Sequence, residues 1–335
     1  MRASGIRTAA RRLVTVPALL VLLPVSVALL LLCLVLTGPV SLLSRGRWRP
    51  VRLSGFLVLY LLVELVGLAA AVADGLGPRG ALERRSYARL GWLLGVLCRA
   101  AVPVFGLRVE VADEQAAAPA AGHPDRPLLV LARHAGPGDS FLLVYAILAH
   151  ARLRPRIVLK QALRLDPCLD VLLSRVPHCF VPRDAAPHRT AAGIAVLASG
   201  LGAGDALVIF PEGGNFTERR RERALRWLRR HGRRREAAQT ARLTRVLPPR
   251  TEGTLAALAA APGADVVFVA HTGLDAVVSA RTLWRNVPLR RPVRAAWWRI
   301  GAEDVPDGPV GQAEWLRAQW ARVDSWIVEH SGSAG

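Results

Sequence analysis

The fold is decided by the stretch Leu128-Leu-Val-Leu-Ala-Arg133-His134-Ala-Gly-Pro-Gly-Asp139-Ser140. It begins with an uninterrupted apolar run, residues 128–131, which has the length and composition of a buried β-strand. A glycine-rich turn follows, and residues 140–150 then continue as an apolar segment that predicts a helix. A buried strand that turns directly into an apolar helix is typical of an α/β fold.

Within this stretch, His134 and Asp139 are the residues that could carry chemistry. On one continuous helix, a separation of five residues would place the two side chains about 140° apart, where they could not form a hydrogen bond. Gly136-Pro137-Gly138 predicts a tight turn instead, and this turn lets the carboxylate fold back onto the imidazole. In such a pair the carboxylate fixes the ring tautomer while the histidine takes a proton from a substrate hydroxyl. We therefore predict a catalytic dyad of His134 and Asp139, which needs no protein nucleophile.

Two other interpretations of the same residues remain open. In the first, Asp139 only caps the helix that begins at Ser140, and His134 is an ordinary residue at the end of a strand. In the second, Gly138-Asp139-Ser140-Phe141 resembles the block of GDSL-type hydrolases, which would make Ser140 a nucleophile for ester hydrolysis. That family also has a DxxH motif late in the chain, whereas Asp324 and His330 are spaced differently.

A second block follows the apolar run at residues 207–210 and reads Phe210-Pro-Glu212-Gly213-Gly214-Asn-Phe-Thr217. A strand that enters a glycine turn before a helix can present backbone N–H groups to a phosphate or an oxyanion. The adjacent carboxylate of Glu212 could hold a hydroxylated backbone such as glycerol. We predict that Glu212, Gly213 and Gly214 bind substrate, although an ordinary strand-to-helix turn capped by Thr217 would have the same pattern.

Two basic residues between these blocks are candidates for phosphate binding. Lys160 is the only lysine of the chain, and Arg183 ends the segment His178-Cys-Phe-Val-Pro-Arg183 after a predicted strand. Lysine and arginine at strand ends are suited to hold a phosphate group. Each of the two alone is more typical of an exposed surface charge than of a phosphate site.

The rest of the chain alternates between short apolar runs and helical patterns. The predicted strands are residues 107–111, 128–131, 156–159, 179–181, 207–210 and 266–269. The predicted helices are residues 140–150, 163–173, 188–199, 218–241 and 312–329, and residues 112–126 are predicted to form a surface loop. This order predicts an α/β catalytic domain over residues 106–335, with a mostly parallel sheet flanked by helices.

Residues 1–105 are predicted to anchor the chain in a membrane. Residues 13–37 contain no charged residue and are long enough to span a bilayer, although a cleaved signal peptide is the competing interpretation. Residues 55–73 form a second apolar segment around Glu64, so we expect an apolar helical hairpin in which this carboxyl is neutral, packed against the first segment or near an interface. Residues 90–104 suit an interfacial helix. Arginines flank the first segment on both sides and therefore give no orientation.

The formal net charge of +20 requires an anionic partner, which could be nucleic acid, acidic lipid headgroups or a phosphorylated substrate. The apolar segments favour the last two, and the basic stretch at residues 219–235 could lie on anionic headgroups or form a solvated helix face. The four cysteines have no CxxC spacing, so the sequence indicates neither a zinc site nor a disulfide framework. We expect reduced cysteines and a catalytic domain that faces the cytoplasm.

Taken in this order, the blocks resemble the glycerolipid acyltransferase family, typified by 1-acylglycerol-3-phosphate acyltransferases, over about residues 128–269. The resemblance implies that His134 and Asp139 are the family's HxxxxD pair and that Arg183 contacts the acceptor phosphate. It also implies that the block around Glu212 binds the acceptor, and Lys160 lies where the family often has a lysine. Residues 246–253, Val-Leu-Pro-Pro-Arg-Thr-Glu-Gly, are similar to a stretch of the lysocardiolipin acyltransferase branch.

The chain departs from the family pattern at several positions near these blocks. Gly214 and Asn215 replace the common Thr-Arg pair, Arg133 stands where Asn or Ser is usual, and Ala270-His271 replaces a frequent proline. These departures concern the identity of the acceptor more than the type of reaction.

The resemblance implies an enzyme that transfers a fatty acyl group from acyl-CoA or acyl carrier protein to a lysophospholipid hydroxyl, with no metal or redox cofactor. We expect 1-acyl-sn-glycerol 3-phosphate as the acceptor, phosphatidic acid as the product and a bacterial-type inner membrane as the location. We expect no nucleic-acid partner, and the sequence does not indicate an oligomeric state. A non-enzymatic basic membrane adaptor is the other class of protein that would explain the charge.

Overall fold

The computed structural model describes residues 2–44, 46–111, 126–182 and 186–331 of the chain, which divides into two compact units. The first unit comprises Met1–Leu107 together with two later segments, Leu159–His178 and Trp284–Arg290. The second unit comprises Arg108–Val158, Cys179–Leu283 and Arg291–Gly335. The candidate catalytic residues His134 and Asp139 belong to the second unit.

The described part of the second unit is built on a seven-stranded sheet with the strand order β1-β7-β6-β2-β5-β3-β4. The pairs β2/β5, β2/β6, β3/β5 and β1/β7 are parallel, whereas β6 and β7 are antiparallel. The prediction of an α/β fold with a mostly parallel sheet is therefore confirmed. The strands are β1 (Val109–Val111), β2 (Leu128–Ala132), β3 (Arg154–Lys160), β4 (His178–Val181), β5 (Asp205–Ile209), β6 (Asp265–Thr272) and β7 (Val293–Ile300).

The register of the central strands brings their carboxyl ends to one edge of the sheet. Leu129 of β2 lies opposite Leu207 of β5 on one side and opposite Val266 of β6 on the other. Because the three strands are parallel, the segments that follow them leave the sheet at the same edge. This is the edge at which open α/β sheets place their functional sites.

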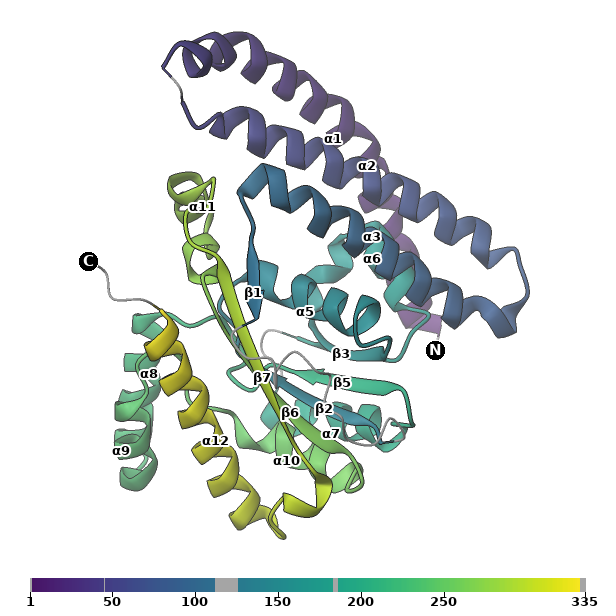
Figure 1. Ribbon diagram of the computed structural model, residues 1–335. Helices are drawn as coiled ribbons and strands as arrows, with labels where there is room; N and C mark the ends of the chain where they lie inside the picture. The colour runs from purple at the N-terminus through teal and green to yellow at the C-terminus, as the bar shows by residue number, and fades with distance from the viewer. Residues whose placement is uncertain (1, 45, 112–125, 183–185, 332–335) are drawn as a thin grey trace. The chain divides into compact units, whose positions relative to one another are not determined.

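Helices cover both faces of this sheet (Figure 1), because successive residues of β2 point to opposite sides. Leu129 and Leu131 belong to the main core, which contains side chains of α7 (Pro187–Ser199), α10 (Thr251–Ala260) and α12 (Pro309–His330). Val130 faces the other side and packs with Ile147 of α5 (Pro137–Ala149). The near-continuous apolar sequence of β2 is thus explained by burial on both faces.

Several elements differ from the sequence-based expectation. β7 and α10 were not predicted, and the helix expected over residues 163–173 is a 3-10 turn, η2 (Gln161–Leu165), followed by the short α6 (Pro167–Leu173). The helix expected over residues 218–241 is divided into α8 (Glu218–Arg230) and α9 (Arg234–Arg242), with Gly232 between them at a φ of 71°. A left-handed residue of this kind ends a helix. The loop expected at residues 112–126 lies outside the described residues except for Arg126.

The first unit begins with long apolar helices, as predicted. Its helices are α1 (Arg2–Leu43), α2 (Arg49–Gly75) and α3 (Leu82–Phe105), the last preceded by the 3-10 turn η1 (Arg79–Ala81). Among the described residues, three segments are long and apolar enough to span a membrane: Ile6–Leu43, Arg49–Gly75 and Arg79–Phe105. The third is longer than the interfacial helix expected at residues 90–104.

Polar residues in this unit have partners in the segment that contains α6. The Glu64 side chain is buried, and its Oε2 accepts the backbone N–H of Cys168 at 3.3 Å. Asp170 accepts from Arg11 at 2.6 Å and from Arg12 at 2.8 Å. The basic residues at the start of α1 are therefore partly neutralised within the protein.

Replacement of Trp320 tests how the core supports the second unit. Its side chain is fully buried in α12, and its indole N–H donates to the Leu247 carbonyl oxygen at 3.0 Å. Trp320→Ala should lower the free energy of unfolding of the detergent-solubilised chain by about 3–5 kcal/mol, because it leaves a cavity and an unpaired carbonyl. Val328→Ala, at a half-exposed position of the same helix, is the matched control. Equal effects of the two changes in a denaturation experiment would contradict this description of the core.

Candidate active site

The candidate site is built from the segments that follow the three central strands. Arg133 and His134 follow β2, the Phe210 to Gly214 turn follows β5, and His271 lies near the end of β6. The shared sheet edge thus brings together residues that are far apart in the sequence. Of the residues predicted to form the site, it gathers His134, Asp139 and Glu212.

His134 and Asp139 are in direct contact. The Nδ1 atom of His134 lies 3.0 Å from Oδ1 and 3.1 Å from Oδ2 of Asp139, and both side chains are buried. The ring of Phe210 lies against the imidazole, with a centroid distance of 4.8 Å. Because Nδ1 faces a carboxylate, the neutral ring carries its proton on Nδ1, and Nε2 is then the ring atom that can receive a proton.

The turn that makes this contact possible differs from the predicted one. Helix α5 begins at Pro137, so the second and third residues of the predicted turn are already helical, and Gly136 is its extended N-cap residue. A proline suits the first position of a helix because it lacks an N–H that would remain unpaired there. Residues 134–136 are therefore not helical, and Asp139 is the only member of the pair that lies on the helix.

Asp139 combines the two functions that were considered as alternatives. Its Oδ2 accepts the backbone N–H groups of Ala135 at 2.6 Å and Gly136 at 2.9 Å, as an acidic residue in a first helical turn can do. The same carboxylate also holds the His134 ring. The capping bonds fix the carboxylate on the backbone, so the imidazole is oriented by a rigid partner.

A second histidine lies on the other side of this carboxylate. Nε2 of His271 is 3.7 Å from Oδ2 of Asp139 and 3.2 Å from the carbonyl oxygen of Arg133. Burial alone would raise the pKa of Asp139, but the hydrogen bond from His134 and the electrostatic effect of the two histidines hold it below its ordinary value. Burial, together with the charge of Arg133, lowers the pKa of His271. At neutral pH the carboxylate is therefore ionised and His271 is neutral.

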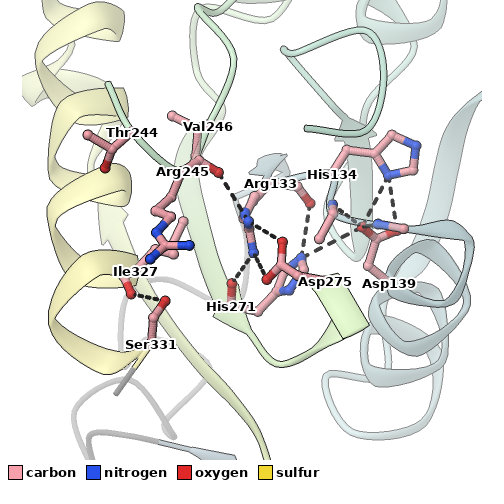
Figure 2. Close-up of polar contacts among 12 residues, drawn as sticks. Arg133, His134, Asp139, Thr244, Arg245, Val246, His271, Asp275, Ile327 and Ser331 are labelled. Carbon is pink, nitrogen blue, oxygen red and sulfur yellow. Dashed lines mark hydrogen bonds and ion pairs between the residues drawn. The ribbon is translucent and has the colours of Figure 1, made fainter. Parts of the chain in front are cut away.

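Arg133 is buried at the centre of a polar network (Figure 2). Its guanidinium forms a bidentate pair with Asp275, at 2.6 and 3.0 Å, and donates to the carbonyl oxygens of His271 at 2.8 Å and Arg245 at 3.1 Å. These bonds join the segment after β2 to the segments after β6 and before α10. Bidentate arginine pairs give geometric specificity as well as energy, so this network fixes the backbone on which His134 stands.

Glu212 holds the backbone of the same segment. Its side chain is buried, Oε1 accepts the His134 N–H at 2.8 Å, and Oε2 accepts the Leu247 N–H at 2.7 Å. Burial raises the pKa of Glu212 to about 8 against the effect of these two N–H groups. In the structure, Glu212 is thus a support for the His134 backbone, and its proposed contact with an acceptor stays a prediction.

The two glycines after Glu212 allow arginine side chains to approach the turn. A Cβ atom on Gly213, which has a φ of 65°, would lie 2.8 Å from Cζ of Arg250. A Cβ atom on Gly214 would lie 2.8 Å from Nη1 of Arg220. The Gly213 N–H donates to the Phe210 carbonyl oxygen at 3.0 Å, so it is already used within the turn.

The other candidates from the sequence are Lys160, Arg183 and Ser140. Lys160 is the exposed last residue of β3 and belongs to the first unit, whereas His134 belongs to the second. Arg183 lies outside the described residues. The hydroxyl of Ser140 donates to Oδ1 of Asp139 at 3.2 Å. Roles in phosphate binding for Lys160 and Arg183 stay predictions.

In the sequence, Arg133 and His271 stand out only as departures from a family pattern. Their long-range partners could not be foreseen, because Asp275 and Arg245 are more than 100 residues from Arg133 along the chain. The sequence did contain one signal of this network, which is that both unusual residues occur in the same chain. An unusual arginine directly before His134 and an unusual histidine at the end of the neighbouring strand are the changes that a shared network would require.

Comparison with known families gives a match over the described site. The family model described as Acyltransferase matches residues 108–272 of the chain. This range extends from the start of β1 to the end of β6 and includes His134, Asp139 and Glu212. Comparisons with curated proteins and with solved structures found no match.

The raised pKa of Glu212 predicts a specific pH dependence of stability. An unfolded chain releases this proton near the ordinary value of 4.5, whereas the folded protein keeps it up to about pH 8. The contribution of protonated Glu212 to the free energy of unfolding is therefore lost as the pH rises from about 4.5 to about 8. In thermal unfolding, the melting temperature of wild type minus that of Glu212→Gln should fall from pH 5 to pH 8. Glu252→Gln, at an exposed position of α10, should give a constant difference, and parallel curves for Glu212→Gln would refute the assignment.

Proposed function

We propose, from the premise that residues 108–272 form an acyltransferase-family domain, that the protein transfers a fatty acyl group from a thioester donor to the hydroxyl of a lysophospholipid. The acceptor is 1-acyl-sn-glycerol 3-phosphate, and the product is phosphatidic acid. The family domain supports acyl transfer to a glycerolipid, and the three long apolar helices suit an enzyme whose substrates lie in a membrane.

The observation that carries this proposal is the contact between Nδ1 of His134 and the carboxylate of Asp139. It gives the imidazole the tautomer of a general base and stabilises the imidazolium that proton uptake creates. The buried surroundings strengthen this electrostatic effect because they exclude water. A base held in this way can act directly on a substrate hydroxyl.

The reaction is then a direct transfer of the acyl group from the thioester to the acceptor oxygen. Nε2 of His134 takes the proton of the acceptor hydroxyl while the oxygen attacks the thioester carbonyl. A C–O bond forms, the C–S bond breaks, and the departing thiolate takes the proton back from the imidazolium. The cycle leaves His134 neutral and requires no covalent enzyme intermediate.

The contacts of Ser140 favour this reaction over ester hydrolysis by a serine nucleophile. A nucleophilic serine must donate its proton to the base in the course of the reaction. The Ser140 hydroxyl instead donates to Asp139, the carboxylate that also orients His134. Ser140 is thus placed to support the dyad.

His134→Ala tests the proposed general base. Activity should be measured with radiolabelled acyl-CoA and lysophosphatidic acid in membranes that contain equal amounts of each variant. We expect kcat/KM to fall by about a hundredfold or more, the usual scale of general acid–base catalysis. His150→Ala, at the exposed end of α5, is the matched control and should stay near wild type.

Three outcomes would contradict the proposal. Near-normal turnover by His134→Ala would show that His134 is not the general base. A loss of activity in Ser140→Ala as deep as that in His134→Ala, together with release of free fatty acid by wild type, would instead indicate a serine esterase. Lipid binding without any acyl transfer by the wild-type protein would indicate a non-enzymatic adaptor.

A further inference from the structure

A large pocket of the second unit is not explained by the dyad. It has a volume of about 960 Å³ and lies between α8, α9, the middle of α12 and the segment from Leu247 to Glu252. The turn from Glu212 to Gly214 forms part of its wall. Its lining includes six arginines: Arg220, Arg223, Arg233, Arg242, Arg250 and Arg317.

The acidic residues of the lining neutralise only part of this charge. Glu236 pairs with Arg233 at 2.6 Å and with Arg317 at 3.3 Å. Asp324 is buried and accepts backbone N–H groups of residues 244–246, and Glu314 pairs with Arg235, which lies outside the lining. Among the described residues, the other four lining arginines have no carboxylate partner.

The four unpaired arginines, Arg220, Arg223, Arg242 and Arg250, therefore outnumber the remaining exposed acid of the lining, Glu252. Arg250 and Arg220 also lie against the two glycines of the turn, where a Cβ atom would be 2.8 Å from each guanidinium. Guanidinium groups gathered around a concave surface match the oxygens of phosphate groups. The pocket thus has the charge of a site for an anion with several phosphates.

An aromatic side chain adds a second feature. Trp227 lines the pocket, is about half exposed, and stacks on His231 with a centroid distance of 4.2 Å. A neighbouring hollow of about 350 Å³ shares Trp227 and Arg223 and adds Arg226, Arg230 and His231. The Arg233 guanidinium also lies over the Trp227 ring, with Cζ 5.6 Å from its centroid. The exposed part of this aromatic and cationic group, with arginines on either side, suits contact with an aromatic base that carries phosphates.

The pocket also adjoins the candidate active site. Glu212 forms part of its wall, and the His134 N–H donates to the carboxylate of this same residue. A ligand held in the pocket by its phosphates could therefore extend a flexible arm around the turn. A coenzyme A thioester has such a structure, since it carries three phosphates and an adenine at one end and the acyl group at the other.

We propose that this arginine pocket binds the phosphorylated adenine nucleotide of a coenzyme A thioester, which makes acyl-CoA the donor; this proposal rests on the proposed function. A single lipid phosphate would leave most of the unpaired arginines without a partner. An acidic carrier protein would require an open surface, whereas these arginines line a hollow.

The experiment measures equilibrium binding to the full-length chain in lipid nanodiscs. The probes are CoA, dephospho-CoA, adenosine 3′,5′-bisphosphate and pantetheine. Arg223→Gln and Arg250→Gln should each weaken the binding of CoA and of the bisphosphate by about tenfold, with pantetheine unaffected. Arg229→Gln is the matched control, because it is exposed on α8 and lines neither hollow. In wild type CoA should bind more tightly than dephospho-CoA, and Arg223→Gln should reduce this difference.

The same variants should raise KM for acyl-CoA and leave kcat unchanged, with melting temperatures that show intact folding. Equal weakening by Arg229→Gln would show diffuse attraction and overturn the proposal. Displacement of the bisphosphate by glycerol 3-phosphate would assign the pocket to the acceptor, and binding of acyl carrier protein but not CoA would assign it to a protein donor. The test of CoA binding is independent of the test of the general base. If His134→Ala kept full activity, the proposed function would fail although CoA binding could persist.

Discussion

The candidate site depends on one carboxylate that folds back from the first turn of α5. Asp139 accepts the backbone N–H groups of Ala135 and Gly136 and holds Nδ1 of His134 at 3.0 Å. The first two bonds fix the carboxylate relative to the chain, and the third fixes the ring relative to the carboxylate. Without the helix start at Pro137, the pair would lie on different faces of one helix and could not meet. The local backbone geometry at the start of α5 thus brings His134 and Asp139 into contact.

The surrounding fold supports this arrangement through the His134 backbone. Glu212 joins the His134 N–H to the Leu247 N–H, and the Leu247 carbonyl accepts from the buried indole of Trp320. The Phe216 N–H donates to the His134 carbonyl oxygen at 3.1 Å. A residue that must be positioned within fractions of an ångström is therefore connected through Glu212 and Leu247 to the core helix α12. The block around Glu212 acts here as structure as well as a proposed binding surface.

The sequence predicted the strands that position the site, because β2 and β5 are short, apolar and buried on both faces. It also predicted that His134 and Asp139 would meet. It did not predict β7, whose two arginines and two tryptophans obscure the apolar pattern, or the helix break at Gly232. The partners of Arg133 and Glu212 come from distant segments, so only the folded chain could identify them. Local patterns are readable from sequence, whereas long-range polar contacts depend on the register of the sheet.

The most direct test of the dyad is the kcat of Asp139→Asn in the acyl-transfer assay. Oδ2 of Asp139 accepts two backbone N–H groups, so the introduced amide should keep its oxygen there and direct its NH₂ group at Nδ1 of His134. Nδ1 would then be an acceptor, and the proton would move to Nε2, where it blocks the base. We predict that kcat falls by about a hundredfold or more, with KM for the acceptor and the melting temperature nearly unchanged. A kcat close to that of wild type would contradict it.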